Sequence, residues 1–213
     1  MGGFNGVAVC RMGVERARMK HALAYRVPSI SDAGSRIILD PFIGLDSIQK
    51  ELLVTNDIFD LASKVGRALE AKRLVLSTAE SCTGGGVSQA VTDIAGSTAW
   101  FDCGFVTYSN ASKTELLEVP AALIAQFGSV SEEVAGRMAE GALGNSTADV
   151  AVSTTGIAGP TGAVPGKPVG TVCFGWARGD TTFTERLVFQ GDRQAVREQA
   201  VAHALQGLLR FIE

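Results

Sequence analysis

A serine, Ser81, lies in a stretch of mostly small residues, 77–86, that directly follows the short apolar run 74–76. A helix-like segment begins at Val87, so the stretch is typical of a turn between a strand and a helix. Such a turn directs backbone N–H groups and the positive end of a helix dipole at one point, where negative charge is stabilised. A serine hydroxyl beside that point would suit acyl transfer. The glycines of the turn equally fit a simple reversal of the chain.

A serine nucleophile needs a base, which is most often histidine. His21 lies in an N-terminal region of different texture, and His203 lies in the middle of an amphipathic C-terminal segment, so both are expected to be structural or solvated. A lysine can serve instead if its pKa is lowered. Lys113 is the candidate, because the predicted helix N-terminus there disfavours positive charge. Tyr108 would lie at the same sheet edge. An exposed Lys113 and a buried Tyr108 ring remain the alternative interpretation.

A second glycine-rich stretch, residues 154–162, also follows a predicted strand. Such a loop can direct several N–H groups at one anion, typically a phosphate. It matches neither a P-loop nor the G-x-G-x-x-G pattern. Lys167 would add a positive charge to a bound phosphate or remain solvated. The nearby Pro160, Pro165 and Pro168 also fit a long connection without a ligand.

The cysteines bear on two further classes of site. Cys10, Cys82, Cys103 and Cys173 form no C-x-x-C pair, which argues against a zinc site and a disulfide framework. Scattered single cysteines fit a reducing, cytoplasmic location. Cys103 and Cys173 lie in strand-like runs and are predicted to be core residues. A cysteine hydrolase with Cys82 as its nucleophile is a further interpretation, but the sequence offers no credible histidine as its base.

The bulk composition excludes several classes of protein. The 213 residues are 46% hydrophobic and 19% charged, which suffices for a sizeable core. A net charge of −3 and 7% aromatic residues provide neither a basic surface nor a stacking platform for nucleic acid. No apolar run reaches the roughly 18 residues of a membrane helix. No basic and then apolar N-terminal pattern indicates secretion.

The predicted elements alternate between helix and strand, and then two strands follow one another directly. This order predicts a three-layer α/β/α sandwich with a mixed, mostly parallel sheet that contains one antiparallel hairpin. The first helix is expected to be capped by Asn56 or Asp57, and later helices by Ser109 or Asn110 and by Ser131. The last helix is expected to run from Asp192 or Arg193 to Phe211. The predicted strands cover residues 74–77, 103–108, 149–153, 169–177 and 183–189.

The chain is predicted to have two parts. Residues 1–55 are locally basic and show no sustained apolar period, so we expect a peripheral or poorly ordered N-terminal extension. Residues 56–213 carry the periodic pattern of a globular domain.

Four motifs follow one another at residues 78–85, 104–110, 155–160 and 167–172. Together they resemble the CinA C-terminal domain family, whose members include nicotinamide mononucleotide deamidases. The resemblance covers about residues 57–213 and implies a three-layer α/β/α fold. It also implies hydrolysis of the carboxamide of nicotinamide mononucleotide to nicotinic acid mononucleotide and ammonia. No metal or organic cofactor is implied, and a homo-oligomer is expected.

The resemblance assigns the family's catalytic serine, tyrosine and lysine to Ser81, Tyr108 and Lys113. Ser81 would attack the amide carbon, and neutral Lys113, directly or through Tyr108, would take its proton. The N–H groups of Cys82 and Thr83 are expected to stabilise the oxyanion. The residues expected to bind the nucleotide lie in or beside the two glycine-rich loops: Thr83, Gly84, Gly85, Asn110, Thr155, Gly156, Ile157, Ala158, Gly159, Thr161, Gly162 and Lys167.

The chain departs from the family in two places, and an alternative function stays open because not all stand-alone members of the family are demonstrated enzymes. Many members carry an additional nucleotide-processing domain, which residues 1–55 do not resemble, and Gly86 replaces a bulkier residue. The alternative is a non-catalytic module that binds nucleotide phosphate and is linked to competence or DNA-damage responses. Ser81, Tyr108 and Lys113 together favour the enzyme, because a phosphate binder needs only the glycine loops.

Overall fold

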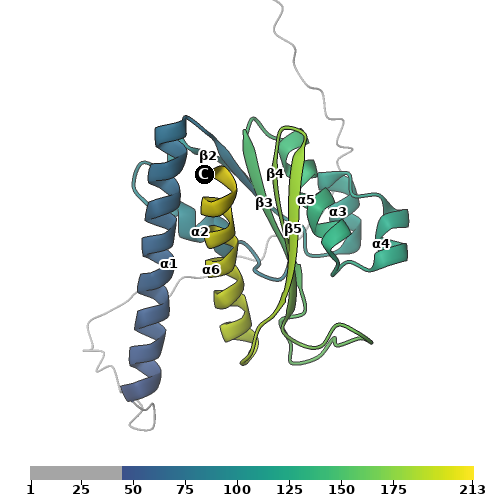
Figure 1. Ribbon diagram of the computed structural model, residues 1–213. Coiled ribbons are helices and arrows are strands. Elements are labelled where there is room, and N and C mark those ends of the chain that lie inside the picture. The colour runs from purple at the N-terminus through teal and green to yellow at the C-terminus, as the bar shows by residue number, and fades with distance from the viewer. Residues whose placement is uncertain (1–44) are drawn as a thin grey trace, which may run out of the picture. The chain divides into compact units, whose positions relative to one another are not determined.

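The computed structural model describes the backbone of residues 45–213 and the side-chain surroundings of residues 58–213 (Figure 1). Predictions about residues 1–44, including His21 and Cys10, lie outside the described residues. The elements in chain order are α1 (Leu45–Lys72), β1 (Leu76–Glu80), α2 (Gly86–Thr92), a 3₁₀ turn (Ser97–Ala99), β2 (Phe101–Val106), α3 (Asn110–Leu117), α4 (Ala121–Phe127), α5 (Glu132–Gly144), β3 (Val150–Gly156), β4 (Thr171–Arg178), β5 (Thr181–Val188) and α6 (Arg193–Ile212).

The five strands form one mixed sheet in the order β2-β1-β3-β4-β5. β1 pairs in parallel with both β2 and β3, whereas β4 is antiparallel to both β3 and β5. Four strands therefore share one direction and β4 runs against them, although parallel and antiparallel pairings are equal in number. The predicted mixed sheet with a hairpin is confirmed.

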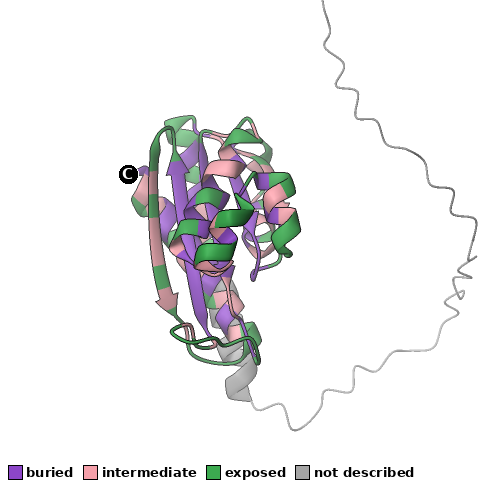
Figure 2. Cartoon of the chain, turned by 90° about the vertical axis from the view of Figure 1, so that its right-hand side faces the viewer, coloured by how far each residue is buried: buried purple, intermediate pink, exposed green. Residues whose placement is uncertain are grey.

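Helices cover both faces of this sheet and complete the three layers. α1, α2 and α6 lie on one face, and α3, α4 and α5 lie on the other (Figure 1). The central strands are buried between the layers (Figure 2). β3 and β4 are buried along almost their whole length because both of their faces are covered. β5, at one edge, alternates between exposed and half-buried residues.

Two predicted helix caps and the predicted start of the last helix are confirmed. Ser109 and Ser112 form a reciprocal capping box at the start of α3. The side chain of Ser131 accepts a hydrogen bond from the N–H of Val134 in α5. Asp192 caps α6 in the same way, so the ends of these helices are encoded locally.

The predicted start of α1 is wrong. The helix begins at Leu45, so Asn56 and Asp57 lie inside it and do not cap it. Neither proline nor glycine interrupts residues 45–65, and nothing in the backbone therefore forces the helix to start later. Among the described side chains, the apolar period that begins at Ile58 faces the core, since Ala62, Val65 and Leu69 are buried in it.

β2 also differs from its prediction. It covers Phe101–Val106, so Thr107 and Tyr108 lie beyond the strand. Cys103 on this edge strand is only partly buried, which contradicts its prediction as a core residue, whereas Cys173 is buried as expected. No helix in the described part is both long enough and apolar enough to span a membrane.

Candidate active site

The carboxyl ends of the three parallel strands meet at one edge of the sheet. Glu80, the last residue of β1, pairs with Val106 of β2 on one side and with Thr154 of β3 on the other. The N–H of Ser81 continues this ladder by donating to the carbonyl of Thr154 at 2.9 Å. This edge is where open α/β sheets bind their ligands, and it brings together residues from three distant parts of the chain.

Ser81 and Lys113 touch at this edge. Lys113 Nζ donates to Ser81 Oγ at 3.0 Å and to the carbonyl oxygen of Thr107 at 2.7 Å. Only 1% of Lys113 and 8% of Ser81 are exposed. Burial lowers the pKa of Lys113 to about 8, and the nearby Cys82 opposes this change only in part. The neutral amine, which can accept the proton of the serine hydroxyl, is therefore accessible near neutral pH.

A small cavity of about 140 Å³ opens onto this pair. A typical site for a drug-sized ligand has about 300–1,000 Å³, so this cavity holds only one part of a nucleotide. Its lining comes from the ends of β1 and β3, from the β2–α3 connection and α3, from the α4–α5 connection and from the start of α6. The lining residues are Ser81, Cys82, Tyr108, Lys113, Ser129, Val130, Thr155, Gly156, Ala158 and Arg193.

Tyr108 lies at the rim of the cavity and is 65% exposed. Its hydroxyl accepts a hydrogen bond from Nη2 of Arg193 at 3.3 Å. Among the described residues it has no hydrogen bond to Lys113 or Ser81. The geometry therefore presents a direct Lys113–Ser81 contact, with the tyrosine beside it and not between them.

A buried carboxylate occupies the N-terminus of α2. Glu80 is fully buried, and its two oxygens accept five hydrogen bonds. The donors are the hydroxyls of Thr83 and Ser88 and the N–H groups of Gly85, Val87 and Ser88. The positive end of this short helix thus stabilises an anion that belongs to the protein itself. Sequence analysis missed Glu80, although an acidic residue at the end of a strand, directly before a glycine turn, was a usable signal.

This carboxylate changes the interpretation of the first glycine turn. The Gly85 N–H and the Thr83 hydroxyl, both expected to bind substrate, donate to Glu80. The Gly84 N–H donates to the carbonyl of Ser81. The Thr83 hydroxyl and the N–H groups of Gly84 and Gly85 therefore hold the turn in shape, which leaves little for a ligand phosphate.

The two N–H groups expected to stabilise an oxyanion are not used in this way to hold the turn. In the described part of the chain, neither the Cys82 N–H nor the Thr83 N–H has an oxygen partner. Hydrogen bonding by both N–H groups to the Cys82 side chain lowers the pKa of its thiol. Burial outweighs this effect and raises the pKa of the Cys82 thiol to about 12, so the thiol stays protonated. Cys82 is thus a poor candidate for the nucleophile.

The second glycine-rich loop supplies one wall of the cavity. Thr155, Gly156 and Ala158 line it, and the Thr155 hydroxyl donates to the carbonyl of Ser129. Ile157 donates its N–H to Thr171, and the carbonyl of Gly159 accepts from Arg193. This part of the loop therefore faces the reacting pair and is held firmly.

Of the twelve residues expected to bind substrate, only Thr155, Gly156 and Ala158 line this cavity. Thr161 and Gly162 are exposed in the outer part of the loop. Lys167 donates to the carbonyl of Phe127, and Asn110 lies on the exposed start of α3. A phosphate beside the Ser81 cavity would meet the guanidinium of Arg193 before any of them.

Arg193 is a residue that sequence analysis missed as part of the site. It is the first residue of α6, and its guanidinium bridges the Tyr108 hydroxyl and the carbonyl of Gly159. It also lines a larger cavity of about 560 Å³ between α1, α2 and α6. Its position far along the chain from Ser81 gave no local signal.

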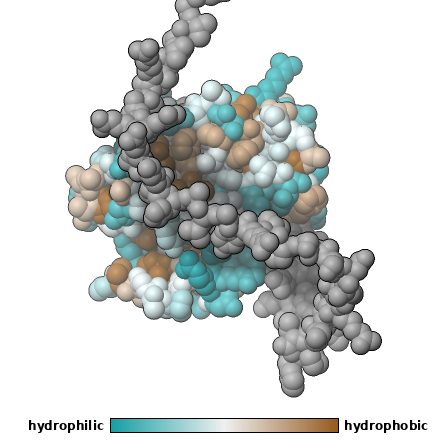
Figure 3. Space-filling view, turned by 180° about the vertical axis from the view of Figure 1, so that it is seen from behind, coloured by the Kyte–Doolittle hydropathy of each residue, from teal (hydrophilic) through white to brown (hydrophobic). Residues whose placement is uncertain are grey.

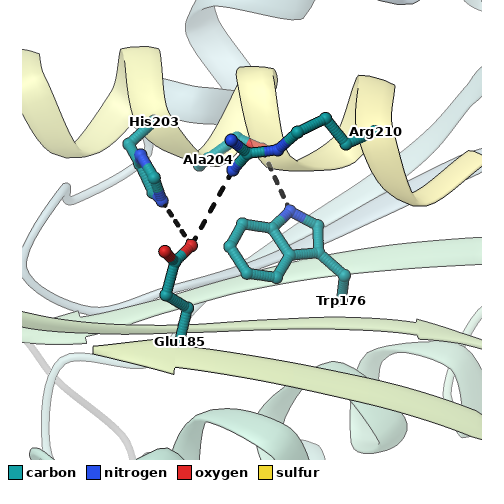
Figure 4. A network of polar contacts seen from close by, with 5 residues as sticks. All are labelled: Trp176, Glu185, His203, Ala204 and Arg210. Atoms are coloured by element: carbon teal, nitrogen blue, oxygen red, sulfur yellow. Dashed lines mark hydrogen bonds and ion pairs between the residues drawn. The ribbon is translucent and has the colours of Figure 1, made fainter. Parts of the chain in front are cut away.

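His203 does not serve the site. Its Nε2 lies 2.8 Å from a carboxylate oxygen of Glu185, which Arg210 also approaches at 3.8 Å (Figure 4). The ring packs on Phe174, and beside it the indole N–H of Trp176 donates to α6. His203 is therefore structural, as expected. The described residues include no cluster of three potential metal-ligating side chains.

A protein-family model, the CinA C-terminal domain, matches residues 58–212. The chain is 51% identical over 154 residues to nicotinamide-nucleotide amidohydrolase PncC of Pseudomonas putida, covering 72% of this chain and 96% of that protein. It is 52% identical over 158 residues to the PncC of Escherichia coli K12, covering 73% and 95% of the two chains.

Solved structures agree with this match. A crystal structure of a CinA superfamily protein from Klebsiella pneumoniae superposes with a TM-score of 0.71 at 39% identity. The superposition covers 73% of this chain and 97% of that one. The α/β architecture described above is thus that of the superfamily.

Proposed function

The chain belongs to the CinA C-terminal domain family, and we propose that it hydrolyses the carboxamide of nicotinamide mononucleotide to nicotinic acid mononucleotide and ammonia. The observation that carries this proposal is the buried contact between Lys113 Nζ and Ser81 Oγ. The names of relatives with about half of their residues identical support the choice of substrate.

The first half of the reaction forms an acyl-enzyme. Neutral Lys113 takes the proton of Ser81 as Oγ attacks the amide carbon. The N–H groups of Cys82 and Thr83 stabilise the resulting oxyanion. When the carbon–nitrogen bond breaks, the Lys113 ammonium gives its proton to the leaving nitrogen, and ammonia departs. An ester to Ser81 remains.

The second half reverses these roles with water. A water molecule attacks the ester carbon while Lys113 takes one of its protons, and Ser81 regains a proton from Lys113 as the ester bond breaks. The product leaves as a carboxylate. The direct contact of Lys113 with Ser81 favours this route over a relay through Tyr108.

Tyr108 and Arg193 hold the substrate at the mouth of the cavity in this proposal. The 140 Å³ cavity takes the ring that bears the amide, so the ribose phosphate lies outside it. Arg193 lines this cavity together with Gly156 and Ala158 of the second glycine-rich loop. A phosphate would replace the Tyr108 hydroxyl and the Gly159 carbonyl as partners of the guanidinium.

The substrate assignment is tested by incubating purified full-length protein with nicotinamide mononucleotide and, separately, with nicotinamide riboside, which lacks the phosphate. We expect equal amounts of ammonia and nicotinic acid mononucleotide from the first, and a much higher KM with the second. A well-folded protein that binds the mononucleotide without releasing ammonia would instead indicate the non-catalytic module.

We further propose that the protein works in the cytoplasm as a homo-oligomer, without nucleic acid or a metal. The free thiols of Cys82, Cys103 and Cys173 fit a reducing compartment. Hydrophobic residues stand among hydrophilic ones on the face seen from behind (Figure 3), and Val106 and Leu116 are about half exposed. Light scattering after size exclusion would test the assembly, and a monomer at working concentration would contradict it.

A further inference from the structure

Arg197 of α6 binds the turn that follows Ser81, and it lines the larger cavity but not the one that holds Ser81. Its Nε donates to the carbonyl oxygen of Cys82 at 3.2 Å, and its Nη2 donates to that of Thr83 at 2.8 Å. Among the described residues, no other donor reaches the Cys82 carbonyl. One guanidinium thus fixes the orientation of two successive peptide groups.

The helix that carries Arg197 is firmly anchored. Its neighbours Val196, Ala200 and Val201 are buried in the core beneath α6. Val201 also lies close enough to Gly86 that an added Cβ there would be 3.0 Å from its methyl group. The guanidinium is therefore held in place relative to the turn by packing as well as by its own hydrogen bonds.

One of these bonds acts directly on an expected oxyanion donor. The carbonyl of Cys82 and the N–H of Thr83 belong to the same peptide group. A cationic donor on that carbonyl draws electron density from the amide and makes the Thr83 N–H a stronger hydrogen-bond donor. It also fixes the direction in which that N–H points.

The other bond reaches the second expected oxyanion donor through one more step. The carbonyl of Thr83 shares its peptide group with the Gly84 N–H, which donates to the carbonyl of Ser81 at 3.1 Å. That carbonyl shares its peptide group with the Cys82 N–H. The hydrogen bonds thus form a chain from the guanidinium to the Cys82 N–H, and such chains polarise cooperatively.

Glu80 complements this arrangement. Its carboxylate accepts hydrogen bonds from the N–H groups of Gly85, Val87 and Ser88. Arg197 donates hydrogen bonds to the carbonyls of Cys82 and Thr83. The two charged side chains leave the N–H groups of Cys82 and Thr83 without an oxygen partner in the described part.

We propose that Arg197 is a positioning residue that orients and polarises the Cys82 and Thr83 N–H groups for the oxyanion formed when Ser81 attacks. The inference rests on the proposed amide hydrolysis. Arg197 acts on the transition state and not on the bound substrate, so its loss lowers kcat and leaves KM nearly unchanged.

The site offers a route for chemical rescue. Arg197 borders the cavity of about 560 Å³ together with Thr83 and Gly86. In R197A, a guanidinium ion from solution can enter the vacated space from this cavity and donate to the same two carbonyls. A residue that only supported folding would not be replaced in this way.

The experiment measures kcat and KM for the wild type, R197A and R197K, with and without millimolar guanidinium chloride. We expect R197A to lose about 10-fold to 100-fold in kcat, which is less than the loss of an oxyanion donor itself, with KM changed by less than about threefold. Guanidinium should restore several-fold of the activity of R197A. R197K keeps the charge but not the two-point contact, so its kcat should lie between those of the wild type and R197A. This variant also keeps the proposal testable if R197A folds poorly.

The matched control is R210A. Arg210 lies on the same helix, is 61% exposed and approaches only Glu185 among the described acidic groups. Its kcat should equal that of the wild type, and guanidinium should not raise it. An unchanged kcat in R197A, or a higher KM at the same kcat, would overturn the proposal.

A second readout separates this proposal from the substrate assignment. Phenylmethylsulfonyl fluoride reacts with an activated serine through a transition state in which negative charge develops on an oxygen. Labelling of Ser81, followed by mass spectrometry, should be slower in R197A than in R210A whichever amide is the true substrate. Equal labelling rates in R197A and R210A would contradict the role of Arg197. If R197A is labelled more slowly but the wild type releases no ammonia from nicotinamide mononucleotide, only the substrate assignment is contradicted.

Discussion

Lys113 is a lysine, a residue that is normally charged and exposed, in a position that almost no water reaches. It is 1% exposed, and its amine lies between the Ser81 hydroxyl and the Thr107 carbonyl. Neither partner carries a negative charge, so burial dominates and lowers the pKa of Lys113 to about 8. The same burial that makes the lysine costly for folding makes its neutral form available as a base.

The pH dependence of the reaction should report this lysine. Because the neutral amine is the base, kcat/KM should rise as the pH increases, with a midpoint near 8, and should level off above it. Initial rates of ammonia release from pH 6 to 9.5 would measure this limb. A profile that is flat or falling across this range would exclude Lys113 as the base.

The free energy of unfolding should also depend on pH because of Lys113. The pKa of Lys113 is about 8 in the folded protein and about 10.4 in the unfolded chain. Between these values the unfolded state binds more protons, so the free energy of unfolding gains a contribution that grows with pH. In K113M this contribution is absent. The stability of the wild type relative to K113M should therefore rise from pH 7.5 to 10, as measured by urea unfolding, and a constant difference would contradict the lowered pKa.

At this scale the sequence predicted the pair and missed its surroundings. Ser81 and Lys113 stand in recognisable positions, after a strand and in the first turn of a capped helix. Arg193 and Arg197 act through hydrogen bonds to backbone groups of segments far away in the chain, and such contacts leave no spacing to read in the sequence. Glu80 instead binds the turn that directly follows it, so its place before the glycines was a local signal.

The turn between β1 and α2 owes its shape to the buried Glu80 carboxylate. E80Q keeps the size of the side chain but replaces one oxygen by an NH₂ group that faces N–H and O–H donors. At least two donors lose their acceptor, which should cost about 2–4 kcal/mol of unfolding free energy. S88A leaves the carboxylate four donors and should cost about 1 kcal/mol. Urea unfolding of both variants would test this, and an E80Q as stable as S88A would refute the role assigned to the carboxylate.

Helices α3 and α5 approach closely at Gly141. A Cβ at this position would overlap the carbonyl oxygen of Leu117, the last residue of α3, whereas a Cβ at Gly144 would meet nothing within 4 Å. G141A should therefore destabilise the protein by about 1–3 kcal/mol. G144A, in the same helix, should stabilise it by about 0.5–1 kcal/mol. Thermal unfolding of the two variants provides the comparison, and equal melting temperatures would contradict the close packing.

Helix starts were the most predictable elements, because a cap is a local signal that Ser109, Ser131 and Asp192 each provide. The start of α1 was not predictable from apolar periodicity, which reports packing and not helicity. The predicted end of β2 was also wrong, because the N–H of Thr107 still donates to the backbone carbonyl of Glu80 although the strand has ended at Val106.

Over the whole molecule, the order of elements was sufficient to predict three layers around a mixed sheet. It could not give the strand order, which places β1 at the centre of the site between β2 and β3. The family match begins at residue 58, within α1, and includes the residues of this helix that are described as packing on the core. The division into residues 1–55 and 56–213 stays a prediction.

The central claim is that Ser81, activated by Lys113, cleaves the amide. The most direct measurement is ammonia release from nicotinamide mononucleotide by the wild type, S81A and C82A side by side, at a pH above 8 with folding checked by circular dichroism. The account predicts release by the wild type and C82A and none above background by S81A. Release that survives in S81A, or that is lost in a well-folded C82A while S81A stays active, would contradict it.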